Sequence, residues 1–168
     1  MELVERLAAA RLGGTYNQYA AAPQLCERLE RYLEDRAGAS ILLVGEAAGY
    51  RGARISGIPF TSERQLTGAG PAEATATVVR TTLAELGLEE EVLCWNVVPT
   101  HPGTATTNRR PTRVEIEAGL PFARALARGR RVLACGRVAE AALGAPYVRH
   151  PSHGGATAFR ATLLQCLS

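Results

Sequence analysis

The stretch from residue 41 to residue 62 constrains this chain most, because a buried strand pattern there runs directly into a glycine-rich loop. Ile41–Val44 is short, apolar and branched, which is typical of a buried strand. Four glycines follow, at positions 45, 49, 52 and 57. Residues without a Cβ let the backbone approach a ligand closely. With Glu46 one residue past the strand, the pattern favours a ligand cleft that a carboxylate faces, although an ordinary crossover loop with a solvated Glu46 fits it equally well.

The composition is that of one globular domain spanning residues 1–168. Hydrophobic residues make up 46% of the chain, enough for a substantial core, and charged residues make up 21%, which gives no case for disorder. The net charge of +3 permits a polyanionic partner without requiring one. All 19 basic residues are arginine, so no lysine amine is available for Schiff-base catalysis.

The cysteines indicate neither a zinc ribbon nor a thioredoxin-type site, because they lie far apart and form no CxxC pair. No charged-then-apolar leader opens the chain, and no apolar run approaches about 18 residues. The sequence therefore predicts a soluble cytoplasmic protein.

Helical and strand patterns alternate along the chain. Helices are expected over residues 1–12, 23–38, 71–86, 111–126, 136–143 and 156–167, and strands over 41–44, 91–96, 131–135 and 146–149. This alternation predicts an α/β fold, a three-layer α/β/α arrangement with a central four-stranded parallel sheet. Glu46, Asn96 and His150 each follow a strand, and ligands bind at the carboxyl edge of such sheets.

Three motifs lie at these strand ends. Gly45–Gly49 (GEAAG) with Gly57–Thr61 (GIPFT) resembles the first motif of the uracil-DNA glycosylase superfamily, in the GEAPG…GxPF form of its family four branch. Asn96–Pro99 followed by Asn108–Thr112 resembles the NxVK…NRxPT segment of that branch, and His150–Ser152 is similar to its closing HPS motif. The resemblance implies a uracil-DNA glycosylase-like fold and a DNA repair hydrolase that cleaves the N-glycosidic bond of uracil, or of another deaminated base, in DNA.

The resemblance also implies a base-binding set made of Gly45, Ala47, Phe60 and Asn96. An aromatic ring must sandwich a base that has been extracted from the stack, and Phe60 matches that position. A carboxamide offers both the acceptor and the donor that a pyrimidine edge needs, so Asn96 is assigned to that edge. Two structural alternatives stay open, a core phenylalanine and an asparagine that caps its own loop.

The catalytic candidates implied by the resemblance are His150, Glu46 and Glu63. His150 would donate to O2 of the departing base, where negative charge develops, and a neutral imidazole still has one N–H for this. Glu46 would orient or activate water. Glu63 is a second candidate because family five places its acidic residue near this position. A purely structural histidine before the proline turn is the alternative for His150.

The expected partner is DNA containing a deaminated base, bound by a monomer without a membrane or metal-cluster component. Ser152, Arg109 and Arg110 are candidates for phosphate contacts, although a solvated surface role fits each arginine equally well. Without lysine, a lyase step is not expected. The sequence therefore predicts a monofunctional glycosylase that leaves an intact abasic site.

Several positions depart from the family four pattern. The stretches that would carry its iron–sulfur cysteines contain none, so no cofactor and no metal site are expected. Ala48 and Pro99 replace a proline and a lysine, and the residues after Ser152 lack a bulky wedge. These departures leave the preferred lesion open. They also motivate an alternative, a catalytically weak or inactive damaged-DNA binding protein of the same fold. A pocket for a free nucleobase or nucleotide is a third option.

Overall fold

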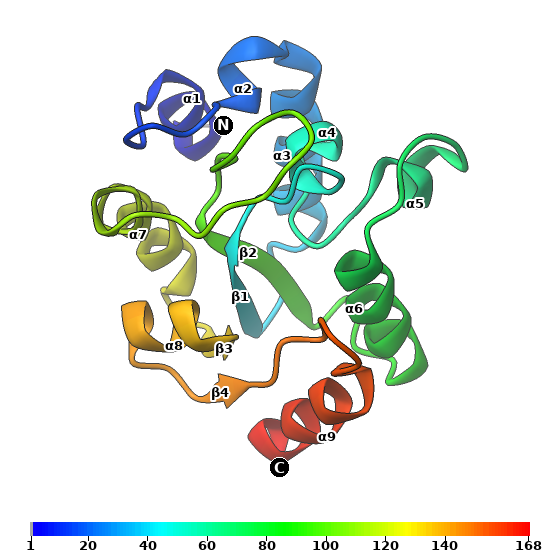
Figure 1. The fold of residues 1–168 in the computed structure, drawn as a ribbon. Helices are drawn as coiled ribbons and strands as arrows, with labels where there is room; N and C mark the ends of the chain where they lie inside the picture. Colours follow the sequence, from blue (N-terminus) through cyan, green and yellow to red (C-terminus); the bar gives the residue numbers. More distant parts are fainter. Residues whose placement is uncertain (1) are drawn as a thin grey trace.

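Four parallel strands form the centre of the computed structural model, which describes residues 2–168 (Figure 1). The strands are β1 (Ile41–Ala47), β2 (Val92–Val98), β3 (Arg131–Cys135) and β4 (Tyr147–Val148), in the spatial order β2-β1-β3-β4. The chain leaves β1 for β2 on one side and later returns to place β3 on the other. The strand order therefore reverses beside β1, which is where open parallel sheets bind ligands.

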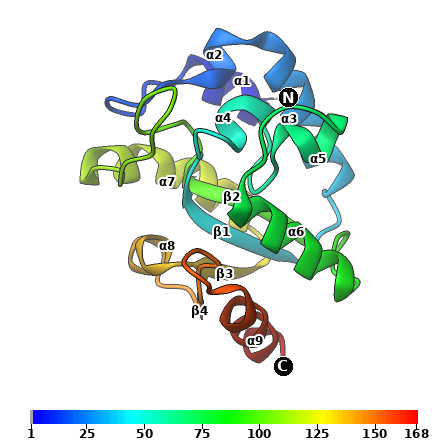
Figure 2. The same cartoon turned by 45° about the vertical axis from the view of Figure 1, so that its right-hand side comes forward.

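Alternating strand residues build two hydrophobic layers. Leu42 and Val44 pack in one core cluster, and Ile41 and Leu43 pack in the other, because successive side chains point to opposite faces. The first face is covered by α1 (Glu2–Ala9), α3 (Pro23–Asp35), α7 (Arg113–Ala127) and α8 (Arg137–Leu143), and the second by α6 (Ala74–Glu85) and α9 (Ala156–Leu167) (Figure 2). The predicted three-layer α/β/α fold with a four-stranded parallel sheet is confirmed.

Three short helices lie in segments that carry no helical sequence pattern: α2 (Gln18–Ala21), α4 (Ala53–Ser56) and α5 (Glu63–Thr67). Local capping explains them. The Asn17 side chain accepts hydrogen bonds from the amides of Tyr19 and Ala20, which starts α2. Both α4 and α5 end at a glycine with φ 78°, a left-handed conformation that favours glycine. The predicted helix at residues 1–12 ends early, at Ala9, and its first residue lies outside the described residues.

The first two strands are longer than predicted. Gly45 and Asn96 are register partners within β1 and β2, and so are Ala47 and Val98, whereas the apolar pattern placed Gly45, Glu46 and Asn96 beside strand ends. Backbone pairing explains the difference, because the ladder continues whether or not the side chains are apolar. These residues nevertheless lie near the carboxyl ends of β1 and β2. The segments that carry them therefore meet at the carboxyl edge of the sheet, as the sequence predicts.

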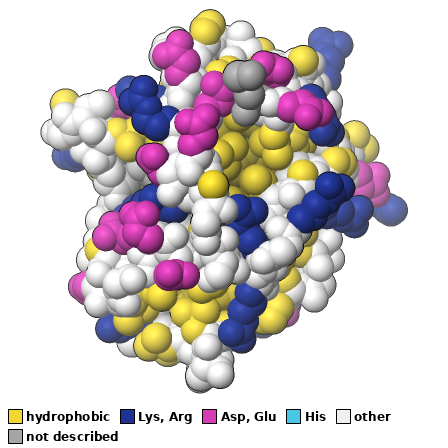
Figure 3. Space-filling view, turned by 180° about the vertical axis from the view of Figure 1, so that it is seen from behind, with side chains coloured by type: hydrophobic (Ala, Val, Ile, Leu, Met, Phe, Trp, Pro, Cys, Tyr) yellow, Lys and Arg dark blue, Asp and Glu magenta, His cyan; other side chains and the backbone are white. Residues whose placement is uncertain are grey.

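The face seen from behind carries side chains of both charges (Figure 3). Seen from behind, acidic and basic side chains are interspersed around the hydrophobic areas, and neither sign forms a continuous field (Figure 3). Within residues 2–168, no helix is long and apolar enough to cross a membrane.

Candidate active site

Two adjoining cavities lie at the carboxyl edge of the sheet. The inner one, of about 50 Å³, is lined by Glu46, Phe60, Asn96 and His150 among others. The outer one, of about 260 Å³, shares Glu46 and His150 with it and extends to Arg109 and Ser152. Residues from three distant parts of the chain therefore surround one space. Ala47 lines both cavities. Gly45 lines neither of them, and its lack of a side chain leaves space for its neighbours.

Gly45 is required by the packing of two neighbours. A Cβ built at this position would lie 2.9 Å from Asn96 Oδ1, and it would lie as close to the ring of Phe60. Contacts this short do not occur for real Cβ atoms, so any side chain would displace the ring or the carboxamide. Gly45 therefore fixes how Phe60 and Asn96 meet.

Phe60 belongs to the core and to the cavity wall at once. Only 8% of the residue is exposed, and it packs with the apolar cluster under α6 and α9. Its backbone has φ 50°, a left-handed conformation that is strained for a residue with a Cβ. The core alternative and the base-stacking role are thus compatible, because one face of a buried ring can pack while another lines a cavity.

Asn96 is buried, with 4% of the residue exposed, and its carboxamide faces the inner cavity. Within residues 2–168, no hydrogen bond ties this carboxamide to a loop, as a capping asparagine would require. By contrast, Asn108 of the outer cavity accepts a hydrogen bond from the amide of Tyr50. Both polar atoms of Asn96 are therefore available to a ligand.

His150 is held in one tautomer by the residue two positions later. The backbone N–H of Ser152 donates to His150 Nδ1 at 3.2 Å, and the Ser152 hydroxyl lies 2.8 Å from the same nitrogen. A nitrogen that accepts a hydrogen bond carries no proton, so the neutral ring has its N–H at Nε2. Burial, followed by the charges of Arg149 and His153, lowers the pKa of His150. The structure thus presents a neutral imidazole with one free donor.

Two carboxylates line both cavities. Burial raises the pKa of Glu46, and the charge of Arg110 partly opposes this. Glu73, the residue before α6, was missed by sequence reasoning. Its pKa is also raised by burial, and a Cβ at Gly49 would come 2.7 Å from its Oε1. No sequence signal marks Glu73, because the helix predicted from residue 71 places it in the first turn, where an acidic residue is common.

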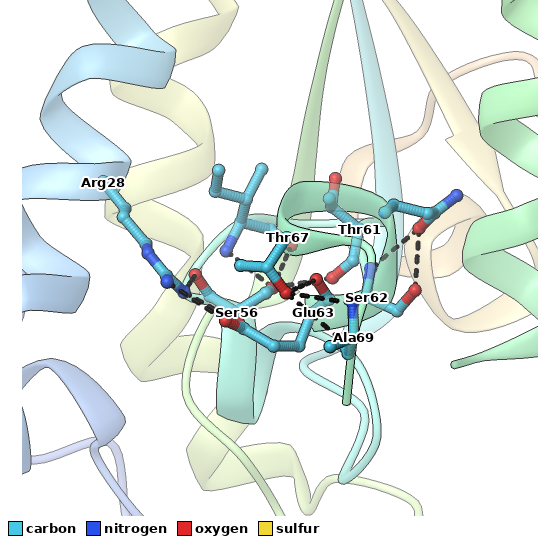
Figure 4. Close-up of polar contacts among 9 residues, drawn as sticks. Arg28, Ser56, Thr61, Ser62, Glu63, Thr67 and Ala69 are labelled. Atoms are coloured by element: carbon cyan, nitrogen blue, oxygen red, sulfur yellow. Dashed lines mark hydrogen bonds and ion pairs between the residues drawn. The ribbon is translucent and has the colours of Figure 1, made fainter. Parts of the chain in front are cut away.

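Glu63 lies elsewhere. It is the first residue of α5, and its carboxylate forms two hydrogen bonds with the guanidinium of Arg28, at 2.7 and 3.1 Å (Figure 4). It lines neither of the two cavities. The structure does not bring Glu63 to the other candidates, so its geometry is that of an ion pair between α3 and α5.

The three residues predicted to contact phosphate differ in whether their side chains are already bonded to other residues. Arg109 forms two hydrogen bonds with Glu115, at 2.6 and 2.8 Å, which holds the loop against the start of α7. Ser152 is engaged with His150, as described above. Arg110 is exposed, and its charge reaches Glu46. Arg110 is thus the freest of the three to meet a phosphate.

A larger cavity, of about 700 Å³, lies between α3, α5 and α6, and Arg28, Tyr32 and Arg80 contribute to its walls. None of the four candidate side chains Glu46, Phe60, Asn96 and His150 lines it. Within residues 2–168, no group of three or more histidine, cysteine or acidic side chains is placed to hold a metal ion. The chemistry implied by the motifs is therefore concentrated at the sheet edge.

The fold and this edge site define a class of protein. The model of the uracil-DNA glycosylase superfamily matches residues 33–164, and the chain belongs to that superfamily. Among solved structures, it is similar to SMUG2 of Pedobacter heparinus, with a TM-score of 0.69 and 13% identity over 99% of this chain and 94% of that one. At that identity the likeness shows the fold alone. No curated protein matches the sequence.

Proposed function

We propose that this protein is a monofunctional DNA glycosylase that hydrolyses the N-glycosidic bond of uracil, or of another deaminated base, in DNA. The observation that carries the proposal is the convergence of Glu46, Phe60, Asn96 and His150 on one cavity. Membership of the uracil-DNA glycosylase superfamily supports a DNA substrate. A flipped base entering this cavity would meet a ring, a carboxamide and an imidazole donor.

The residues support a hydrolytic sequence. Phe60 stacks on the base and Asn96 bonds its edge, while the Nε2–H of His150 donates to O2 as the bond from C1′ to the base nitrogen breaks. The electron pair of that bond leaves with the base, which departs as an anion and takes a proton from solvent. Ionised Glu46 accepts a proton from the water that adds to C1′. Because His150 stays neutral, it stabilises charge without transferring its own proton.

The test is an excision panel. Oligonucleotides containing uracil, hypoxanthine or xanthine, each in single- and double-stranded form, are incubated with the protein, and alkali then cleaves any abasic sites. The proposal predicts cleavage for at least uracil. No product from the uracil-containing strands at stoichiometric protein would remove the uracil claim, and no product from any lesion would refute the glycosylase proposal.

A damaged-DNA binding protein without turnover is the second candidate, and Ala48 and Pro99 favour it because the family four pattern has a proline and a lysine there. Tight lesion binding with no base release would support it. A pocket for a free nucleobase would bind its ligand with an affinity that does not depend on salt. DNA binding through phosphates should instead weaken steeply as the salt concentration rises.

A further inference from the structure

Arg80 of α6 is half-buried behind the segment that carries Phe60. Its Nε donates to the Phe60 carbonyl at 3.2 Å and to Thr61 Oγ1 at 3.0 Å. Its Nη2 donates to the Pro59 carbonyl at 3.3 Å and also to Thr61 Oγ1. One side chain thus binds three consecutive residues, and a planar guanidinium is suited to this because its donors form a rigid fork.

These contacts act where the backbone is strained. Phe60 has φ 50°, and a conformation of this kind costs on the order of 1–3 kcal/mol and persists only when the surroundings hold it. Arg80 bonds the carbonyl of Phe60 and that of the preceding residue. Its guanidinium carbon in turn lies 5.5 Å from the centroid of the Tyr32 ring, and this cation–π contact helps to fix the position of the guanidinium.

Arg80 does not reach the substrate space. It lines the large cavity between α3, α5 and α6 and neither of the two cavities at the sheet edge. The Phe60 segment separates the two regions, since Phe60 lines the inner cavity and Thr61 lines the large one. Any influence of Arg80 on a bound base must therefore pass through the residues that it holds.

We propose that Arg80 is a positioning residue, which holds Phe60 in the strained conformation that directs its ring at the base. The inference rests on the proposed glycosylase function for its catalytic consequence. Its structural half, that Arg80 orders the segment from Gly57 to Glu63, stands independently of activity.

The catalytic half is tested with Arg80→Gln, Arg80→Lys and Phe60→Leu. Arg31→Gln is the control, because Arg31 lines the same large cavity and, within residues 2–168, forms no hydrogen bond to the segment. We expect Arg80→Gln to slow single-turnover excision about 10- to 100-fold, the scale of a small misplacement of a reacting group, with DNA affinity unchanged. Lysine does not restore the rate, because a point charge cannot span three acceptors.

A double-variant cycle shows whether Arg80 acts through Phe60. In the Phe60→Leu protein, Arg80→Gln should cause no further loss of rate, because the ring that Arg80 positions is gone. Losses that multiply, or an Arg80→Gln protein with full rate, overturn the catalytic half.

Hydrogen exchange measured by mass spectrometry tests the structural half. Amides of the segment from Gly57 to Glu63 should exchange faster in Arg80→Gln and Arg80→Lys than in the wild type. In Arg31→Gln they should exchange at the wild-type rate. Unchanged exchange in both Arg80 variants overturns the inference. If the wild-type protein releases no base, the glycosylase proposal fails and the exchange result still decides the role of Arg80. If Arg80→Gln does not fold, Arg80→Lys decides both halves.

Discussion

Gly45 and Asn96 face each other as register partners on β1 and β2, and the absent side chain of Gly45 leaves the space in which the Phe60 ring meets the Asn96 carboxamide. The first glycine of the motif thus has a structural role within β1. It lets an aromatic ring from one segment lie against an amide from another.

Replacing Gly45 by alanine should slow base excision about 100-fold and cost roughly 1–3 kcal/mol of stability, because the added Cβ overpacks a buried position. The added Cβ must push away the Phe60 ring or Asn96 Oδ1, and small displacements of positioned groups cost about 100-fold in rate. Single-turnover excision measures the loss. Gly38→Ala is the matched control, since a Cβ at Gly38 meets nothing within 4 Å. Equal rates for the two variants would contradict the packing argument.

Glu46 and Glu63 should respond differently to glutamine. Glu46→Gln removes the carboxylate from the cavity and should lower the rate by roughly 100- to 10,000-fold, the range for general acid–base groups. Glu63→Gln should leave the rate unchanged and lower the Tm, because it breaks the pair with Arg28. The rates and thermal melts of both variants check this. A large rate loss from Glu63→Gln would return it to the catalytic set.

His150 should contribute as a neutral donor. Burial lowers its pKa from the ordinary 6.5, so the ring stays neutral at pH 7, and His150→Ala should cost about 100- to 1,000-fold in rate, as for the loss of one oxyanion donor. His153→Asn, at an exposed neighbouring position, is the control.

In the pH–rate profile of the wild type, the rising limb should belong to Glu46, which must be ionised to accept a proton from water. That limb should be absent from Glu46→Gln, and its persistence there would assign it to another group.

Glu73→Gln should stabilise the protein at neutral pH. The folded-state pKa of Glu73 is raised above 4.5 by burial, so the folded protein holds the proton while the unfolded chain releases it, and stability falls as the pH rises above 4.5. Glutamine does not titrate. The gain in Tm, on the order of 2–4 °C per kcal/mol, should therefore be larger at pH 8 than at pH 5. A gain equal at pH 5 and pH 8 would show that Glu73 is ionised in both the folded and the unfolded state over this range, which would contradict a raised pKa.

Glu115→Gln should behave in the opposite way. Hydrogen bonds from Arg109 lower the pKa of Glu115 from 4.5 to about 2, so its stabilisation is complete above 4.5 and is lost as the pH falls toward 2. At pH 7 the variant should lose roughly 1–3 kcal/mol of unfolding free energy, the range for hydrogen bonds to charged groups. Urea unfolding at pH 7 and pH 3 checks this. The two proteins should differ much less at pH 3, and an equal difference at both values would exclude the ion pair as the cause.

The fold was predictable because apolar periodicity and glycine or proline boundaries mark elements that are buried. Ile41–Val44 and residues 131–135 carry such patterns, and both are strands in the structure. The extension of β1 through Ala47 was not predictable, since backbone pairing continues past the apolar residues. The short helix α2 depends on one capping side chain, Asn17, in a segment without an apolar stripe.

The candidate site was partly predictable for a related reason. Glu46, Phe60, Asn96 and His150 lie in motifs with a family resemblance, and parallel strands bring their ends to one edge. Glu73 belongs to no motif and reaches the cavity because Gly49 and Gly52 both leave room for its carboxylate. Pairings such as Arg28 with Glu63 depend on how α3 packs beside α5, and no local pattern encodes that.

The central claim is that four side chains surround one base and release it. Its most direct test is the amount of free uracil, measured by mass spectrometry, that equimolar protein liberates from a uracil-containing single strand in one turnover. We predict near-stoichiometric uracil and an intact abasic strand for the wild type, and at least a 100-fold slower release for Asn96→Ala, which leaves the base edge without its partner. No free uracil from the wild type, or equal release from both proteins, would contradict the account.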